Sequence, residues 1–498
     1  MIAWAALILW PMVGIFLFQK YSLAMAISVT IVGGFLLLPE GIGLNLPVLP
    51  TLDKYSIPAL TALIMTSVVL RRTPHAPDVL GGWMPRSVVA LLLLMVLVIG
   101  TFGMVLTNRD SLSYGSVFLP GMRIYDGFAF SLGVVMTLLP MILARRVLAG
   151  PEAQRTLLTV LAVSAVLYTI PVLWEIRMSP QLHRQVYGFF QHSFLQQVRS
   201  DGFRSMVFVD HGLTLSIFLS LAILSATAIM RTSIPKSRFK WGAFAVWLFV
   251  VLVLNKSLGA LVIVVVFLPL ILFIRPRVQL LIAAIFAGVV LTYPTLRAAD
   301  LVPTERLLNI AESIDPQRAR SLRFRIENED ILLEKARERP VFGWGGWSRN
   351  RVYAENGRDV SVTDGEWVIH FGVGGWVRYI GFFGLLCWPL IGLFISKRHR
   401  IDPVCAMLAL ILSAKLVDLI PNAGLVPYIW LIAGSLLGRL ELSLSDRKPM
   451  ATDVIPAVIS APQYRRSFVQ NDAHEPSEEL ASETRSYSRT DINKKRRF

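Results

Sequence analysis

Apolar stretches follow one another along almost the whole chain, separated by short polar segments. A membrane-spanning helix needs about 20 mostly apolar residues. Thirteen stretches approach this length: 2–18, 22–38, 56–70, 87–106, 127–144, 153–173, 206–229, 241–254, 258–274, 278–294, 367–395, 404–421 and 424–440. Some are short, such as the two that flank LNKSLGA at 254–260, so we expect 12 to 14 transmembrane helices. The pattern predicts an all-α, polytopic integral membrane protein.

The same pattern divides the chain into four parts. Residues 1–294 are expected to hold transmembrane helices 1–10, residues 295–366 a large, partly helical outer loop, and residues 367–440 transmembrane helices 11–13. Residues 441–498 lack apolar periodicity and end in NKKRRF, which predicts a disordered cytoplasmic tail that touches anionic lipid. No small-residue cleavage site follows the first stretch, so we expect that helix to be retained.

Composition agrees with a membrane protein. Only 16% of the 498 residues are charged, and the mean hydropathy is +0.58. Cys387 and Cys405 lie in or beside predicted spans, where a thiol behaves as a small apolar group, so no disulfide is implied. A net charge of +16 suits a nucleic-acid partner, but the basic residues occupy short loops between spans, and membrane orientation explains them better.

Basic residues also give the orientation. The segments VLRRTPHAP, ARRVLAG, RTSIPKSRFK, RPR and SKRHR fall on alternate sides of successive spans, and the excess of Lys and Arg in cytoplasmic loops places all of them inside. Three longer segments, 107–126, 174–205 and 295–366, then lie outside. The third of them has eleven arginines and one lysine, Lys335. A guanidinium offers a planar fork to phosphate or carboxylate, whereas ammonium is a point charge, so this bias needs a chemical explanation.

The densest arginine run, RARSLRFRIENE at 318–329, is predicted to lie on one helix. This helix is expected to begin with Asp315 as N-cap and Pro316 at its first position, and to end before Pro340. An apolar stripe of Leu322, Ile326 and Leu333 is flanked by Arg318, Arg325 and Glu329 on one side and by Arg323 on the other, while Arg320 points away. The flanking arginines overhang a cavity in one interpretation and form a solvated face with local ion pairs in the other.

The sequence after this helix, RERPVFGWGGW at 337–347, places Arg325 fifteen residues before a Pro that is followed by a Gly-x-Gly turn. RSDGFRSMVFVDHGL at 199–213 has an Arg-x-x-Gly-aromatic pattern just before a span, and YDGFAFSLGVV at 125–135 begins another span. Together these motifs resemble the O-antigen ligase and Wzy-type polysaccharide polymerase superfamily. With the hydropathy pattern, the resemblance covers roughly residues 1–440.

The resemblance implies a GT-C-like fold in the bacterial inner membrane and an inverting glycosyltransferase that needs no metal or cofactor. Its substrate would be an oligosaccharide repeat unit on undecaprenyl pyrophosphate, used on the periplasmic side to build exopolysaccharide or O-antigen. Membrane lipids, a flippase and a chain-length regulator of the same pathway are the implied partners, and nucleic acid is not. Arginines would stabilise the pyrophosphate leaving group as its charge develops.

Four residues are the candidates for catalysis: Arg325, Arg199, Arg204 and, as the group that orients or deprotonates the acceptor hydroxyl, Asp364. Ligases of the resembled superfamily carry a His followed by Asn, Ser or Gln where this chain has Asp364-Gly365. His370 could replace the missing histidine, but no Asn, Ser or Gln follows it. The departure favours a polymerase over a ligase that moves finished polymer to a lipid or protein acceptor.

Further side chains are candidates for substrate binding, namely Arg323, Arg318, Glu329, His211, Arg349 and Arg351. Each also has a simpler interpretation, as a packed histidine or as ordinary loop surface. Trp344, Trp347 and Trp367 suit either sugar stacking or membrane anchoring. Lys415 and Asp418 share a helical face within a span, as a neutral pair or as the coupling site of a secondary transporter. The sequence shows no metal-ligand spacing, and no internal repeat supports the transporter.

Overall fold

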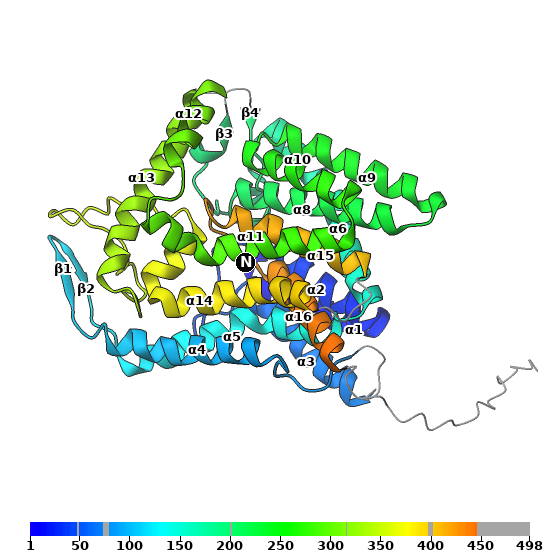
Figure 1. The fold of residues 1–498 in the computed structure, drawn as a ribbon, viewed down its shortest axis with the longest axis horizontal. Helices are drawn as coiled ribbons and strands as arrows, with labels where there is room; N and C mark the ends of the chain where they lie inside the picture. The colour runs from blue at the N-terminus through cyan, green and yellow to red at the C-terminus, as the bar shows by residue number, and fades with distance from the viewer. Residues whose placement is uncertain (47–48, 73–78, 200–201, 315, 397–401, 446–498) are drawn as a thin grey trace, which may run out of the picture. The chain divides into compact units, whose positions relative to one another are not determined.

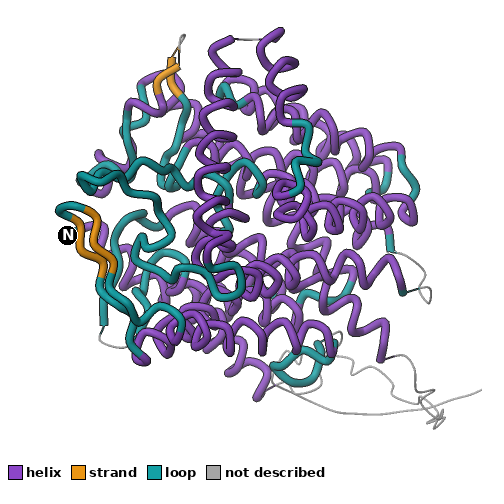
Figure 2. The backbone as a smooth tube through the Cα atoms, turned by 60° about the vertical axis from the view of Figure 1, so that its left-hand side comes forward, coloured by secondary structure: helices purple, strands orange, loops and turns teal. Residues whose placement is uncertain are grey.

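The computed structural model describes residues 1–46, 49–72, 79–199, 202–314, 316–396 and 402–445, which form a bundle of helices (Figure 1). The helices are α1 (Ile2–Lys20), α2 (Leu23–Leu37), α3 (Ser56–Arg72), α4 (Val88–Leu106), α5 (Ile124–Val147), α6 (Pro151–Met178), α7 (Leu182–Tyr187), α8 (Gly212–Thr232), α9 (Pro235–Leu254), α10 (Leu258–Phe273), α11 (Pro276–Ala298), α12 (Thr304–Ile314), α13 (Pro316–Glu338), α14 (Glu366–Ile395), α15 (Pro403–Asp418) and α16 (Pro427–Ser445). Two antiparallel hairpins, orange in Figure 2, join β1 (Leu112–Tyr114) to β2 (Val117–Leu119) and β3 (Val198–Arg199) to β4 (Gly202–Phe203).

Eight of the described helices are long and apolar enough to cross a membrane, namely α1, α4, α5, α6, α8, α9, α11 and α14. The chain is therefore an all-α, multi-pass membrane protein, as the apolar pattern predicts. Helices α2 and α10 are apolar but shorter. Helices α3, α15 and α16 occupy the remaining expected positions and do not meet these length and composition criteria over the described residues. The structure thus supports eight spans directly, fewer than the 12 to 14 expected.

Helices α8 and α15 form the centre of the bundle. Almost every side chain on both is buried, and α8 packs against α6, α9, α10 and α15. Phe218 of α8 meets Phe35 of α2 and Tyr428 of α16 with ring centroids 5.9 and 5.4 Å apart. Polar side chains on α15 consequently have protein rather than lipid around them.

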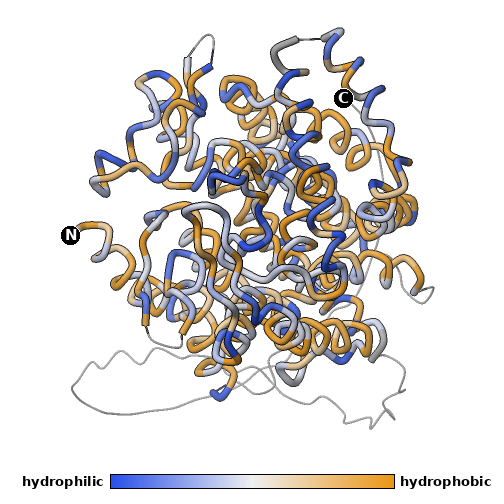
Figure 3. Tube along the Cα trace, turned by 90° about the vertical axis from the view of Figure 1, so that its left-hand side faces the viewer, coloured by the Kyte–Doolittle hydropathy of each residue, from blue (hydrophilic) through white to orange (hydrophobic). Residues whose placement is uncertain are grey.

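The short basic segments and the long segments contact different ends of the long helices. At one end Arg145 of α5 donates to the carbonyl of Gly82. At the other end, beyond the start of α5, Arg339 contacts Asp110. Figure 3 looks onto this second end, which carries β1, β2 and α13, and shows hydrophilic segments among apolar helices. The segments 107–126 and 295–366 therefore lie together, as the alternation of spans predicts.

Helix α14 is interrupted at Gly374 and Gly375, whose backbone angles are φ −132°, ψ 15° and φ 60°, ψ −159°. The segment from Pro340 to Gly345 lies in this break and makes four backbone hydrogen bonds with it. The N–H groups of residues 344 and 345 donate to the carbonyls of 372 and 373, and the N–H groups of 376 and 377 donate to the carbonyls of 340 and 341. A Cβ atom at Gly375 would lie 2.4 Å from the Pro340 carbonyl oxygen, so only glycine fits there.

Several predicted boundaries are confirmed. Helix α13 begins at Pro316 and ends at Glu338, ahead of Pro340, while Asp315 lies outside the described residues. The NKS sequence at 255–257 forms the tight turn between α9 and α10. Helix α16 continues to Ser445, beyond the expected end of the last span at 440, and the rest of the predicted tail lies outside the described residues.

Cysteine labelling tests the separation of the two ends. Ser116→Cys in the β1–β2 turn and Lys236→Cys at the start of α9 place exposed thiols at opposite ends, and the native Cys387 and Cys405 are buried. We expect a membrane-impermeant maleimide to label Ser116→Cys from one side of sealed membranes and Lys236→Cys only from the other. Labelling of both variants from the same side would contradict the arrangement.

Candidate functional site

One face of helix α13 packs against the rest of the protein. Ala319, Leu332, Leu333 and Ala336 are buried, whereas Arg320 is exposed. The helix packs against α12 and α14. Of the predicted apolar stripe, Leu333 is buried, while Leu322 and Ile326 are half-buried, so the prediction holds only in part.

Arg325 links α13 to two other segments and is 33% exposed. Its Nη1 donates to Asn422 Oδ1 over 2.7 Å, and its Nε lies 3.5 Å from Asp364 Oδ2. Asn422 Nδ2 donates in turn to Asp418 Oδ1 over 2.8 Å, and Asp418 Oδ2 accepts from Lys415 Nζ over 2.7 Å. A continuous line of polar contacts thus runs from the loop helix to the buried ion pair of α15.

Glu175, in the last turn of α6, holds the segment that carries Arg204. Its Oε2 accepts hydrogen bonds from the N–H groups of Met206 and Val207, both over 2.8 Å, and from Ser205 Oγ over 3.0 Å. Glu175 is almost fully buried, so these donors supply the stabilisation that water would otherwise give its carboxylate. The segment after β4 is consequently fixed to the membrane helices.

His211 follows this segment as the N-cap of α8. Its Nδ1 accepts a hydrogen bond from the N–H of Leu213 over 3.0 Å, so this ring nitrogen carries no proton. The side chain of Arg204 passes beside the next residue, because a Cβ atom at Gly212 would lie 2.6 Å from Arg204 Cδ. The Nη2 of Arg204 also donates to the carbonyl of Lys256. Loop and helix start therefore form one packed unit.

The electrostatics around His211 show which charges gather here. The pKa of His211 is lowered to about 3, first by burial and then by the charges of four neighbours, in the order His192, Arg204, Arg199 and Arg325. The imidazole is consequently neutral at physiological pH. Arg199, Arg204 and Arg325 come from segments more than a hundred residues apart, and the structure brings them close enough to act on one ring. We call this set the arginine cluster.

Asp364 adds an acidic group to the arginine cluster. Burial raises the pKa of Asp364, while the neighbouring Arg325 guanidinium opposes the rise. A half-buried carboxylate with a raised pKa accepts a proton more readily than an exposed aspartate does. Asp364 therefore has the environment that a general base requires, next to a cation that holds it in place.

Glu329, a candidate for substrate binding, contacts other residues than the sequence analysis suggested. Its Oε1 accepts a hydrogen bond from the Tyr293 hydroxyl over 3.0 Å and lies 3.6 Å from Arg297 Nε, and both partners belong to α11. Burial raises the pKa of Glu329 to about 7, against the opposing effects of Tyr293 and Arg297. The geometry makes Glu329 a contact between α13 and α11, so the predicted substrate contact is not supported.

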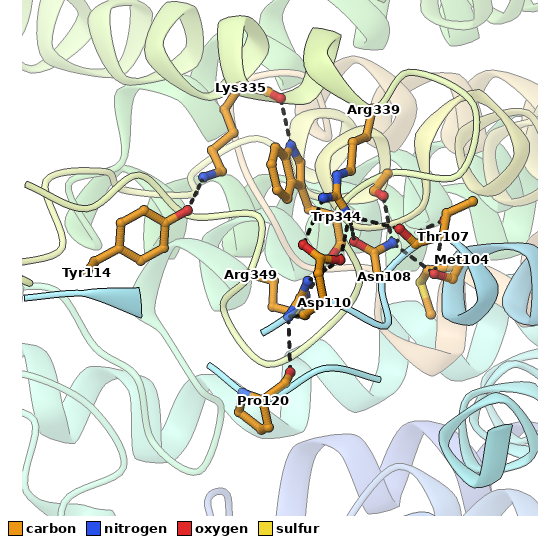
Figure 4. A network of polar contacts seen from close by, with 11 residues as sticks. Met104, Thr107, Asn108, Asp110, Tyr114, Pro120, Lys335, Arg339, Trp344 and Arg349 are labelled. Carbon is orange, nitrogen blue, oxygen red and sulfur yellow. Dashed lines mark hydrogen bonds and ion pairs between the residues drawn. The ribbon is translucent and has the colours of Figure 1, made fainter. Parts of the chain in front are cut away.

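Arg349, also predicted to bind substrate, lies inside a separate polar network (Figure 4). Its side chain is fully buried, with Nε donating to the carbonyl of Trp344 and Nη1 donating to the carbonyls of Asp110 and Pro120 over 3.0 Å. Arg339 contacts both carboxylate oxygens of Asp110 and so lowers the pKa of Asp110. The donors of Arg349 are engaged with protein, which corrects its predicted role to a structural one.

Two more of the predicted arginines, Arg351 and Arg323, lie outside the arginine cluster. Arg351 pairs with Asp359 across a local turn, with Nη1 and Oδ2 2.6 Å apart. Arg323 is exposed on α13, and the side chain of Arg318 lies outside the described residues. Of the ten site residues predicted from the sequence, five therefore meet in one place: Arg199, Arg204, His211, Arg325 and Asp364.

The side chains of His370 and two tryptophans are also engaged by neighbouring protein residues. His370 is buried in α14, where Nδ1 accepts from Arg378 Nε and Nε2 faces Glu366 Oε1, both over 3.1 Å. Trp344 lies between Lys335 and Arg339, with cations 4.4 and 4.2 Å from the ring. Trp367 is fully buried. Trp344 and Trp367 are packing residues, which excludes the anchoring and sugar-stacking roles for both.

Two contributors to this region were missed from the sequence. Asn422 joins Arg325 to Asp418, and Tyr293 caps Glu329 from α11. A polar residue directly after the predicted span that holds Lys415 and Asp418 was the available signal for Asn422. No pattern marks Tyr293, because an interfacial tyrosine is common at the end of a membrane helix.

Among the described residues, no three or more His, Cys, Asp or Glu side chains gather closely enough to hold a metal ion. No protein-family model matches the chain, and a search of curated protein sequences finds no match. The class that fold and composition define is a multi-pass α-helical membrane protein with a cluster of arginines where its long segments meet.

The raised pKa of Glu329 predicts how stability changes with pH. The folded protein holds this proton up to about pH 7 and the unfolded chain only to about 4.5, so the contribution is complete below 4.5 and is lost as pH rises through 7. It amounts to roughly 3 kcal/mol at 1.36 kcal/mol per pKa unit. We expect the melting temperature in detergent to fall between pH 5 and 8 more for the wild type than for Glu329→Gln.

Glu334→Gln is the matched control, because Glu334 is exposed on the same helix. It should keep the pH dependence of the wild type. Equal slopes for all three proteins would show that Glu329 is ionised in the folded state throughout this range.

Proposed function

We propose that this chain is a glycosyltransferase of the bacterial inner membrane that polymerises undecaprenyl-pyrophosphate-linked oligosaccharide repeat units into exopolysaccharide or O-antigen on the periplasmic side. The convergence of Arg199, Arg204 and Arg325 around a neutral His211 carries the proposal. Guanidinium forks match phosphate oxygens in geometry and charge. The motifs that resemble the O-antigen ligase and Wzy-type polymerase superfamily contain these same arginines and support the same substrate.

In the proposed reaction, a hydroxyl of one repeat unit attacks the anomeric carbon of another while the bond from that carbon to pyrophosphate breaks. The bonding electrons leave with the pyrophosphate, and the arginine cluster stabilises the charge that develops on its oxygens. Asp364 takes the proton of the attacking hydroxyl, for which its raised pKa suits it. The anomeric carbon inverts because the hydroxyl enters opposite the leaving group.

The proposal also gives a membrane arrangement. The eight candidate spans together with the five shorter or more polar helices α2, α3, α10, α15 and α16 make thirteen crossings. An odd number puts the two termini on opposite sides, and the basic loops then favour a periplasmic N-terminus and a cytoplasmic C-terminal tail. A flippase would deliver the repeat unit to the outer leaflet, and a chain-length regulator would act on the growing polymer.

A ligase is the second candidate, and one contact counts against it. The ligase histidine of the resembled superfamily has no counterpart beside Arg325, where this chain has Asp364. His370 has both ring nitrogens engaged within α14. A histidine held in this way has no nitrogen left for an acceptor sugar, so the geometry favours the polymerase.

Substitutions of two arginines on α13 test the proposed site. Arg325 is held at the arginine cluster, whereas Arg320 points away from it. We expect Arg325→Ala and Arg325→Lys to lower polymer yield by on the order of a hundredfold, because a transition-state contact is typically worth about 3 to 4 kcal/mol and lysine lacks the fork. Arg320→Ala should leave the yield unchanged at matched membrane expression. Near-normal polymer from Arg325→Ala would place the cationic site elsewhere.

The products that accumulate without the gene distinguish the two candidate enzymes. A polymerase defect should leave single repeat units on the lipid carrier or its acceptor, whereas a ligase defect should leave full-length polymer on the carrier. Electrophoresis of carrier-linked and acceptor-linked glycan measures this directly. Long chains on the carrier in the deletion strain would overturn the polymerase in favour of the ligase.

A further inference from the structure

Arg378 is a cation of α14 that the proposed function does not use. Its side chain is partly covered by protein, with Nε donating to His370 Nδ1 over 3.1 Å and the guanidinium carbon 4.8 Å from the Phe382 ring centre. Its two terminal nitrogens donate to none of the described residues. A charged group within a membrane helix is costly to bury, so an unfilled guanidinium fork there indicates a missing partner.

The break in α14 places a second source of positive charge beside this fork. Helix resumes directly after Gly375, so Arg378 lies in the first turn of the second half of α14. The N–H groups of residues 376 and 377 are taken by the carbonyls of Pro340 and Val341. The start of a helix carries a partial positive charge that favours an anion. The guanidinium of Arg378 and the partial positive charge of the helix start therefore both attract an anion.

A small cavity lies in front of the fork. Gly100, Thr101 and Met104 of α4 and Gly374, Val377 and Arg378 of α14 line it. Thr101 precedes Leu106, the last residue of α4, by five positions, which is roughly 7.5 Å at 1.5 Å per residue. Segment 107–126 begins directly after α4, so the cavity lies in the half of the bundle from which this segment leaves.

The helix surfaces beside the cavity decide which occupant reaches it. Ile99 of α4 and Ile380 of α14 are 63% and 44% exposed, and both helices are candidate membrane spans. Large apolar side chains exposed on such helices face lipid. Arg378 itself is only partly covered. An anion that enters between α4 and α14 therefore arrives attached to a lipid.

We propose that the terminal nitrogens of Arg378, at the small cavity between α4 and α14, bind the phosphate group of a membrane lipid, and that the partial positive charge at the helix start after Gly375 favours the same anion. The site is separate from the arginine cluster, whose members come from other segments. It requires only a lipid phosphate and no glycan, so it stands or falls independently of the proposed polymerase.

Thermal stability of the full-length protein in detergent tests the site with defined lipids. Phosphatidylglycerol should raise the melting temperature of the wild type by on the order of 5 °C at saturation, and diacylglycerol, which lacks phosphate, should raise it less. Arg378→Met should lose the difference between the two lipids, and Arg378→Lys should keep part of it. Arg320→Met is the matched control and should behave as the wild type, because Arg320 is exposed on α13.

The wild-type comparison keeps the test decisive if Arg378→Met does not fold. Equal effects of phosphatidylglycerol and diacylglycerol on the wild type would overturn the site outright. A parallel measurement with undecaprenyl phosphate in place of phosphatidylglycerol shows which lipid the site prefers, because the preferred lipid raises the melting temperature more. If inorganic phosphate alone raises the melting temperature as much as phosphatidylglycerol does, the site binds a free phosphate ion and the proposal of a lipid is overturned.

Discussion

The arrangement of the outer segments depends on the four backbone hydrogen bonds that join residues 340–345 to the interruption of α14. Backbone polar groups in a bilayer have no water to bond with, so a helix can be broken there only if protein supplies the missing partners. Residues 340–345 supply them, which anchors the end of α13 on one side and the Arg349 network on the other. Gly375 and Gly343 are required because a Cβ atom on either would strike the opposing backbone.

Polar groups at the centre of the bundle are arranged by the same rule. Lys415 and Asp418 are almost fully buried, and Asp418 has a second donor in Asn422, which Arg325 completes from outside. Removing one partner of a buried ion pair typically costs about 3 to 5 kcal/mol, because the other charge is left uncompensated. The ion pair therefore ties the position of α13 to the core.

Hydropathy and capping residues were sufficient to predict the helical class and the limits of α13, because both depend on local sequence. The meeting of Arg199 with Arg325 was predicted only through the family resemblance, since nothing local connects residues so far apart. Of the 12 to 14 spans expected, eight meet the length and composition criteria over the described residues, because helices such as α3 and α15 are too short to meet them. The α14 break was not predicted, although its signal, GVGGW, stands in the sequence. Glycines in membrane helices more often serve close packing, so the pattern is ambiguous by itself.

Arg349 and Arg325 belong to the same loop but differ in their surroundings, and the number of backbone carbonyls that each contacts explains the difference. Arg349 follows the segment bound to α14, where the chain turns back against 107–126 and offers three carbonyl oxygens to one guanidinium. Arg325 lies on a regular helix, whose own carbonyls are taken by helical hydrogen bonds, so its fork turns to side chains across the gap. A guanidinium held by three backbone carbonyls is a structural part. Arg325 is held instead by an amide, a carboxylate and one long contact to the carbonyl of Pro421, and in the proposed function phosphate oxygens would replace these partners. Local backbone geometry, more than arginine content, therefore decides where an anion can bind on this protein.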